Sequence, residues 1–177
     1  MTVASIELGQ LPASGRMVTV DAAVVRAPLP RIFELARDVE RWPSLLPHYR
    51  FVRFHERDAS GGGVVEMSAN RPFGALRWPT WWTSQMSARR DSKGESASIR
   101  FRHVRGITTG MEVEWQFTVV DRGAQRGATQ VRVIHVWDGP AWPLIGAAAA
   151  RLVIGPVFVH GIASRTLAWL ARAAEAR

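Results

Sequence analysis

Two histidines stand on the apolar faces of predicted strands, and they are the first candidates for chemistry. His103 follows Ile99 and Phe101 at two-residue spacing, and His135 follows two valines in the same way. Each histidine therefore points with its apolar neighbours toward the predicted interior. A histidine in an apolar cavity can act as a general acid or base near neutral pH. A core histidine hydrogen-bonded to a neighbour gives the same pattern, so both interpretations stay open.

Large aromatic residues form a second group with a possible role in binding. The chain has 8 tryptophans and 1 tyrosine, and large flat apolar side chains line either a core or a pocket for a flat ligand. We expect a pocket that includes Trp42, Tyr49, Trp82, Met86, His103, Trp115, His135, Trp137 and Phe158. A purely structural role in the core is the alternative for Trp82, Trp115 and Trp137.

Several kinds of chemistry find no support in the sequence. The chain has no cysteine, which excludes a disulfide scaffold, a thiolate metal site and a cysteine nucleophile. No HExxH motif, carboxylate-rich loop or paired His-x-His indicates a metal site. Ser68, Ser84 and Ser87 lie in predicted strands without the sharp turn of a serine nucleophile. We therefore expect neither a metal nor a cofactor.

The net charge of +8 comes almost entirely from arginine, with Lys93 as the single lysine. The arginines are spread over several predicted elements and form no long run, which is typical of a solvated basic surface. No nucleic-acid-binding module accompanies them, so we expect no nucleic-acid partner. Peripheral contact with anionic lipid headgroups is a further possibility. The first residues have no apolar signal-peptide core, which predicts a cytoplasmic protein.

The elements that position these residues begin with a strand. Val18 to Val25 alternate with the period of a half-buried strand. Pro28 and Pro30 suit the first turn of a helix, and an apolar face at three- and four-residue spacing follows them. Trp42-Pro43 predicts a boundary, with room for one more helical turn before His48 and Tyr49. These last two residues are predicted either at the mouth of the pocket or in a simple surface loop.

The middle of the chain reads as strands joined by short turns. The predicted strands are the segments near Phe51 and at Gly63 to Ala69, Arg77 to Ala88, Ala97 to Arg105, Met111 to Val120 and Thr129 to Trp137. Short connections between consecutive strands imply an antiparallel meander. On one of these strands Met111, Val113, Trp115 and Phe117 should point inward. Trp78, Trp81 and Trp82 cannot all face inward on a regular strand.

The last forty residues are predicted to be helical. Pro140 to Ala163 is apolar enough to resemble a membrane span, but Arg151 lies near its middle and Gly155-Pro156 interrupts it. An arginine at that depth costs about 2.5–3.5 kcal/mol on insertion scales. We therefore expect a long helix packed on the sheet, with membrane contact as the alternative. At 177 residues the chain suits one domain, which we place at 17–177 after an N-terminal extension at 1–16.

Several short motifs occur in a fixed order along the chain. They are Val25-Arg26-Ala27-Pro28 with Ile32-Phe33, then Asp38 to Pro43, Tyr49, Gly110-Met111 with Trp115 and Phe117, and Thr129 to His135. In this order they resemble the START-like (SRPBCC) helix-grip superfamily, in its polyketide cyclase/dehydrase branch, from about Val18 to Ala174. The resemblance implies an α+β fold, in which a curved antiparallel sheet of about seven strands wraps around a long C-terminal helix and two short helices follow the first strand.

The resemblance also implies roles for particular residues. In aromatase/cyclases of this branch, the tryptophan before a proline and the tyrosine seven residues later line the pocket, which corresponds to Trp42 and Tyr49. Those enzymes also use an arginine two residues after a serine on a middle strand. Here Ser84 is followed by Met86 at that position. A thioether cannot hold a carbonyl or a developing enolate by charge-assisted hydrogen bonds.

Two hypotheses about function follow. The first is a binder or carrier of a hydrophobic or aromatic small molecule, such as a polyketide, a quinone or a lipid-like compound. The second is a polyketide cyclase or dehydratase in which His103 or His135 acts as the acid or base. The missing arginine at Met86 favours the binder.

Overall fold

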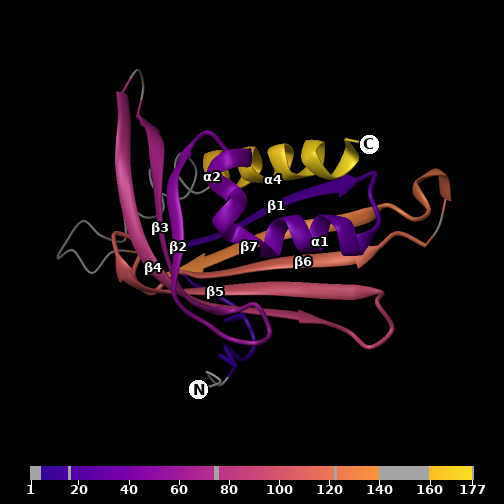
Figure 1. Cartoon of the computed structure of the whole chain (residues 1–177), viewed down its shortest axis with the longest axis horizontal. Helices are drawn as coiled ribbons and strands as arrows, with labels where there is room; N and C mark the ends of the chain where they lie inside the picture. Colours follow the sequence, from indigo (N-terminus) through magenta and orange to yellow (C-terminus); the bar gives the residue numbers. More distant parts are fainter. Residues whose placement is uncertain (1–4, 16, 74–75, 122, 140–159, 177) are drawn as a thin grey trace.

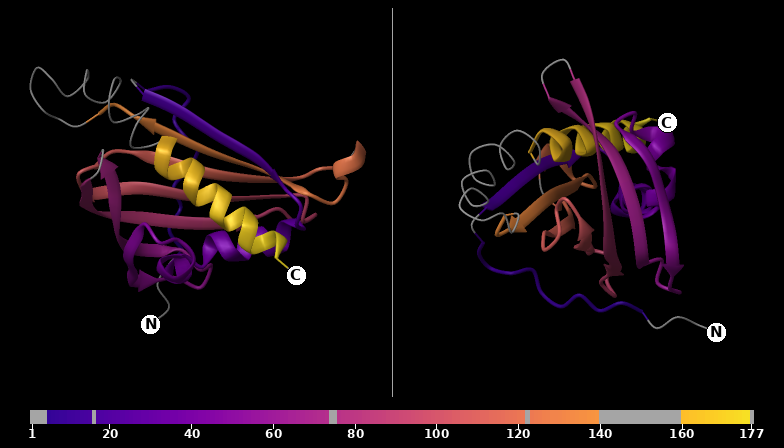
Figure 2. Two further views of the ribbon diagram at one scale, coloured as in Figure 1. Left: turned by 90° about the horizontal axis from the view of Figure 1, so that it is seen from above. Right: turned by 90° about the vertical axis from the view of Figure 1, so that its left-hand side faces the viewer.

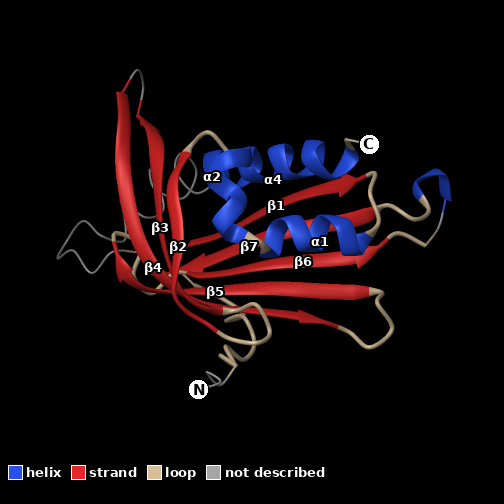
Figure 3. Ribbon diagram, viewed as in Figure 1, coloured by secondary structure: helices blue, strands red, loops and turns tan. Residues whose placement is uncertain are grey.

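The computed structural model describes residues 5–15, 17–73, 76–121, 123–139 and 160–176, without the side chains of 71–78, 124 and 160. Within these ranges the strands form one antiparallel sheet in the order β1-β7-β6-β5-β4-β3-β2 (Figures 1 and 3). The strands are β1 (Met17–Val25), β2 (Tyr49–Arg57), β3 (Gly63–Phe73), β4 (Leu76–Arg90), β5 (Ser96–Gly106), β6 (Glu112–Val119) and β7 (Thr129–Trp137). The predicted meander of seven strands is confirmed.

The helices lie between β1 and β2 and at the C-terminal end of the described chain. They are α1 (Leu29–Arg37), the 3-10 turn η1 (Val39–Arg41), α2 (Trp42–Leu45), a short 3-10 turn η2 (Gly123–Gln125) and α4 (His160–Glu175). Pro28 caps α1 and Pro30 lies in its first turn, where a missing N–H costs little. The two short helices after the first strand are therefore confirmed, and Trp42 marks the boundary between η1 and α2.

Alternation on the central strands decides which side chains are buried. On β6, Val113, Trp115 and Phe117 are each at most 5% exposed. Figure 2 shows α4 lying across the concave face of the sheet. α4 contributes Ile162, Ala163, Thr166, Leu167, Leu170 and Ala174 to the same interior. The core therefore lies between the concave face of the sheet and the helices, as in a helix-grip fold.

The N-terminal residues cross the opposite, convex face of the sheet (Figure 2). The backbone carbonyls of Leu8 and Gly9 accept hydrogen bonds from Arg102 and Arg100 at 3.3 and 2.8 Å. Arg100 and Arg102 also bind the carboxylate of Glu112 at 2.7 and 2.5 Å. Arg100 is 4% exposed, so the extension helps to bury a charged cluster.

Other predictions meet the structure in different ways. Trp81 is exposed and Trp82 is buried, which confirms that the tryptophans of β4 do not all face inward. On β1 the exposed face carries Val18, Val20 and Val24, so the most apolar side of this strand faces outward. Most of the predicted helix at Pro140 to Ala163 lies outside the described residues. None of the described helices combines the length and hydrophobicity of a membrane span.

Candidate ligand-binding cavity

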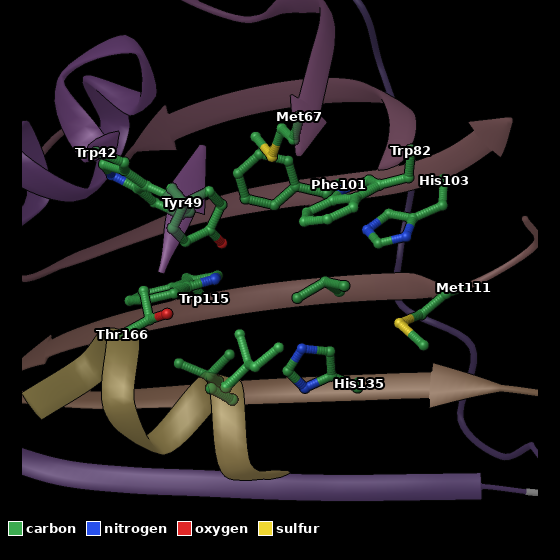
Figure 4. Close-up of a pocket in the computed structure, with 14 residues that line it drawn as sticks. Trp42, Tyr49, Met67, Trp82, Phe101, His103, Met111, Trp115, His135 and Thr166 are labelled. Atoms are coloured by element: carbon green, nitrogen blue, oxygen red, sulfur yellow. The ribbon is translucent and has the colours of Figure 1, made fainter. Parts of the chain in front are cut away.

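A cavity of about 70 Å³ lies between the concave face of the sheet and the first turns of α4 (Figure 4). Strands β2 to β7, α2 and α4 all contribute to its wall. The described lining residues are Trp42, Tyr49, Met67, Trp82, Phe101, His103, Met111, Val113, Trp115, Val133, His135, Ile162, Ala163 and Thr166. Most of this wall is aromatic or aliphatic, so the cavity suits apolar ligand atoms.

Trp42 organises the aromatic end of the cavity. Its indole Nε1 donates to the carbonyl of Leu35 at 3.3 Å, which fixes the ring against α1. The centre of its ring lies 5.2 Å from that of Tyr49 and 5.8 Å from that of Trp115, in the range where aromatic pairs attract. This cluster of large rings leaves flat faces on the cavity wall.

His103 is buried at the end of the cavity near the β5–β6 turn. Its Nδ1 lies 2.6 Å from Oγ1 of Thr108, and its ring stacks on Trp82 with 5.8 Å between centres and 20° between planes. The backbone of His103 bonds to Gly110 and Met111 across the turn. Turn and stacking together hold the imidazole in one orientation against the cavity.

His135 is half-buried on β7 and lines the same cavity. Its Nδ1 lies 3.3 Å from Oγ1 of Thr19 on β1, the residue opposite it in the strand pairing. Thr166 of α4 is the third threonine in the region, and its Oγ1 lies 3.0 Å from Nε2 of His48. Each of these histidines is thus held by a threonine from another element or turn.

The lining of the cavity contrasts with the polar groups on the convex face. No described lining residue is Asp, Glu, Lys or Arg. On the convex face, Glu66 accepts hydrogen bonds from Arg53 and Trp81, both at 2.6 Å, and lies 3.3 Å from His55. Burial alone would raise the pKa of Glu66, but these hydrogen bonds and positive neighbours hold it below its usual value. Charge is therefore concentrated outside the cavity.

The predicted site residues divide into two groups. The structure brings Trp42, Tyr49, Trp82, Trp115 and both candidate histidines to one cavity. The indole of Trp137 is buried and donates to the carbonyl of Thr109 at 3.0 Å, so it packs against the β5–β6 turn instead. Phe158 lies outside the described residues.

Met86 is fully buried but does not line the cavity. It follows Trp82 by four residues on β4, which is about 13 Å at the usual rise of a strand. Toward that end of β4 the guanidinium of Arg90 lies 5.8 Å from the ring of Phe33 on α1. The alternation of β4 correctly predicts that Met86 faces inward. The prediction that Met86 lines the pocket is not met, because its side chain packs in the core beyond the cavity.

Sequence reasoning missed several lining residues. Met67 of β3 and Val133 of β7 carry no signal beyond their apolar alternation. Ile162 and Thr166 lie on the inner face of α4 at four-residue spacing. Thr166 is a polar residue on the apolar face of a helix, and this feature of the sequence could have indicated that a hydroxyl group lines the cavity.

Metal binding has no support from the described residues. Among them, no three His, Asp or Glu side chains come close enough together to hold a metal ion. Two arginines of the surrounding elements also lie at the surface. Arg89 is exposed and pairs with Glu7, and Arg165 is exposed on α4.

The sequence matches a protein-family model, described as polyketide cyclase / dehydrase and lipid transport, over residues 25–157. The chain belongs to this family. The match runs from the last residue of β1 through β7 and includes Trp42, Tyr49, His103 and His135. Among curated proteins, none matches this chain.

Solved structures confirm the fold of this polyketide cyclase/dehydrase family member. A protein of Thermus thermophilus, TTHA0849, superposes with a TM-score of 0.66 at 18% identity, covering 88% of this chain and 94% of the other. Zhui aromatase/cyclase from Streptomyces sp. R1128 gives 0.66 at 20% identity, with 89% and 93% covered. A START superfamily protein from Mycobacterium smegmatis gives 0.56 at 17% identity, with 90% and 94% covered. At these identities the similarity establishes the START-like helix-grip fold alone.

Proposed function

We propose that this protein binds a hydrophobic or aromatic small molecule in the cavity between the sheet and α4, and acts as a binder or carrier. The observation that supports this proposal is the wall of large rings around Trp42. Tyr49 and Trp115 present flat apolar surface there, and apolar surface removed from water contributes about 25 cal/mol per Å². The family to which the chain belongs includes lipid transport as well as cyclisation.

The binder is favoured over an enzyme by the chemistry of the wall. Cyclisation of a poly-keto chain develops negative charge on oxygen, which a fixed cation or several donors must stabilise. No described lining residue is an arginine or a lysine. Met86, which occupies the position of the arginine in the aromatase/cyclase pattern, lies in the core away from the cavity.

A cyclase or dehydratase is the second candidate, because His103 and His135 both line the cavity. An imidazole can transfer protons to and from a bound chain near neutral pH. A threonine hydroxyl lies at hydrogen-bond distance from each imidazole and positions the ring. Such a positioned ring can transfer a proton without an arginine or lysine beside it. Loss of turnover in His103→Gln or His135→Gln, with binding retained, would favour this candidate.

Mass spectrometry of a solvent extract tests the proposed function. The full-length protein is purified from its own host or a related one, and its extract is compared with that of a Leu167→Trp variant. Leu167 is 3% exposed on the inner face of α4, so a larger side chain crowds the interior beside the cavity. We expect a small apolar compound in stoichiometric amount from the unmodified protein and a reduced amount from the folded variant. Equal recovery of the compound from both proteins would mean that it does not bind in the cavity beside α4.

A further inference from the structure

The cavity has hydrogen-bonding groups at two opposite ends and an apolar middle. His103 lies opposite Met111, the residue before β6, and His135 pairs with Val113 of β6. Figure 4 shows both imidazoles on the Met111 side of the cavity. Trp115 follows Val113 by two residues and Met111 by four, which is about 7 and 13 Å at the rise of a strand. At that second end are the hydroxyl groups of Tyr49 and Thr166 (Figure 4). A ligand that spans the cavity therefore has hydrogen-bonding side chains near both of its ends.

The polar groups at both ends are hydroxyl groups and imidazoles, and no carboxylate, ammonium or guanidinium group occurs among the described lining residues. A threonine hydroxyl carries no net charge, and the hydroxyl groups of Thr108 and Thr19 lie at hydrogen-bond distance from the two imidazoles. A neutral imidazole has one donor and one acceptor nitrogen. An ionised ligand in such surroundings would lose its hydration without gaining a charged partner among the described lining residues.

The size of the cavity limits the ligand as well. Pockets for drug-sized ligands measure roughly 300–1,000 Å³, and this cavity measures about 70 Å³. An apolar cavity of about 150 Å³ accommodates one benzene molecule. Met67 and Met111 are the flexible side chains of the wall, and methionine adapts its shape easily. A ligand of one or two rings therefore requires rotation of these two side chains, whereas a longer fused system would also have to displace the aromatic cluster.

From these three features we infer that the cavity selects an uncharged, flat molecule of one or two fused rings with hydrogen-bonding oxygens at opposite ends, the chemistry of a para-quinone or its hydroquinone. The inference rests on the proposed function and narrows its ligand class. The oxygens meet the histidine end and the Tyr49–Thr166 end, and the rings lie against Trp115. Ionised acids and long poly-keto chains fall outside this class.

Three compounds that share one two-ring skeleton test the inference. Equilibrium dialysis at about pH 8, above the ordinary pKa of histidine and of a carboxylic acid, gives Kd values for para-naphthoquinone, naphthalene and naphthoic acid. The chain has no cysteine, so addition of a thiol to the quinone cannot interfere. Hydrogen bonds each contribute roughly a factor of two to ten. We expect the quinone to bind about tenfold more tightly than naphthalene, and naphthoate about tenfold more weakly than naphthalene.

Variants of Thr166 show whether the hydroxyl group at the Tyr49–Thr166 end causes the preference for the quinone over naphthalene. In Thr166→Val the ratio of the naphthalene Kd to the quinone Kd should fall about threefold, because one hydrogen-bonding group is removed at nearly constant volume. Thr166→Ser keeps the hydroxyl and should keep the ratio. Thr118→Val, at an exposed position of β6, is the matched control and should leave all three Kd values unchanged.

The outcomes separate this inference from the proposed function. Equal affinity for quinone and naphthalene, or tightest binding of naphthoate, would overturn the inference while leaving an apolar binder. Tighter binding of the three-ring para-anthraquinone than of para-naphthoquinone would overturn the size limit. No binding of any of these compounds would contradict the proposed function itself.

Discussion

Trp42 connects three parts of the molecule through one side chain. Its indole N–H donates to the Leu35 carbonyl of α1, while its ring contacts Tyr49 at the start of β2 and Trp115 of β6. A large ring at the start of a short helix therefore fixes the position of α2 over the sheet. The same contact places flat aromatic surface on the cavity wall, so packing and recognition depend on the same residues.

Trp115→Ala should weaken binding of para-naphthoquinone by about 1–3 kcal/mol, because a stacked ring contributes about that much. Quenching of tryptophan fluorescence by the ligand measures the affinity. Trp169→Ala is the control, since Trp169 is exposed on the outer side of α4. An unchanged Kd in a folded Trp115→Ala protein would show that this residue serves the core alone.

Met86→Arg should destabilise the fold rather than restore an enzyme. Met86 is fully buried, and burying an unpaired charge costs several kcal/mol. Met86→Leu keeps the volume and should cost less than about 1.5 kcal/mol. Urea denaturation of the two variants measures the difference. A Met86→Arg protein as stable as Met86→Leu would mean that this side chain reaches solvent or the cavity.

At the scale of elements, the turn between β2 and β3 is joined to the N-terminal extension by one carboxylate. Asp58 accepts hydrogen bonds from the Ser60 hydroxyl and the Gly62 backbone at 2.6 and 3.0 Å, and from the Ile6 backbone at 3.1 Å. Burial by itself would raise the pKa of Asp58, but these hydrogen bonds outweigh it and lower the pKa.

The turn between β2 and β3 also needs Gly63, whose φ of 138° lies in a region where residues other than glycine are strained.

The lowered pKa of Asp58 predicts an acid-dependent contribution to stability. The folded pKa lies below the unfolded value of about 3.9, so the contribution is present above about pH 4 and is lost as the pH falls through the folded pKa. Asp58→Asn should cost about 1–3 kcal/mol at neutral pH. This difference from the unmodified protein should shrink between about pH 5 and about pH 2, as urea denaturation at each pH measures. A difference that is constant with pH would contradict the assignment.

Removal of residues 1–13 should destabilise the outer face of the sheet. The deletion takes the Leu8 and Gly9 carbonyls from Arg102 and Arg100, and hydrogen bonds to charged groups contribute about 1.5–3 kcal/mol each before water replaces them. We expect faster hydrogen exchange in β5 and β6 and a net loss of about 1–3 kcal/mol. Glu7→Gln, which removes only an exposed ion pair, should cost less than about 1 kcal/mol. Equal exchange in the truncated and full-length proteins would mean that the extension only rests on the sheet.

For the whole molecule, the sequence predicted the strand meander, the order of helices and most of the aromatic wall. Alternation and turn residues report which face of a strand is buried, which is why Trp115 and both histidines were found. Alternation does not show which of the inward-facing residues lie beside a cavity and which pack in the solid core. Met86 is an example, because it faces inward but does not line the cavity. The partners Thr108 and Thr166 were not predicted, because a threonine that bonds a side chain of another element has no local pattern.

The central claim, that the ligand lies between the sheet and α4, is tested most directly by nuclear Overhauser effects between para-naphthoquinone and methyl groups of the protein. Val113, Val133 and Ile162 line the cavity, whereas Val18 and Val20 lie on the exposed face of β1 and serve as internal controls. We expect effects from the ligand to the first three residues and none to the valines of β1. Effects confined to Val18 and Val20 would contradict the claim and place the ligand on the outer surface.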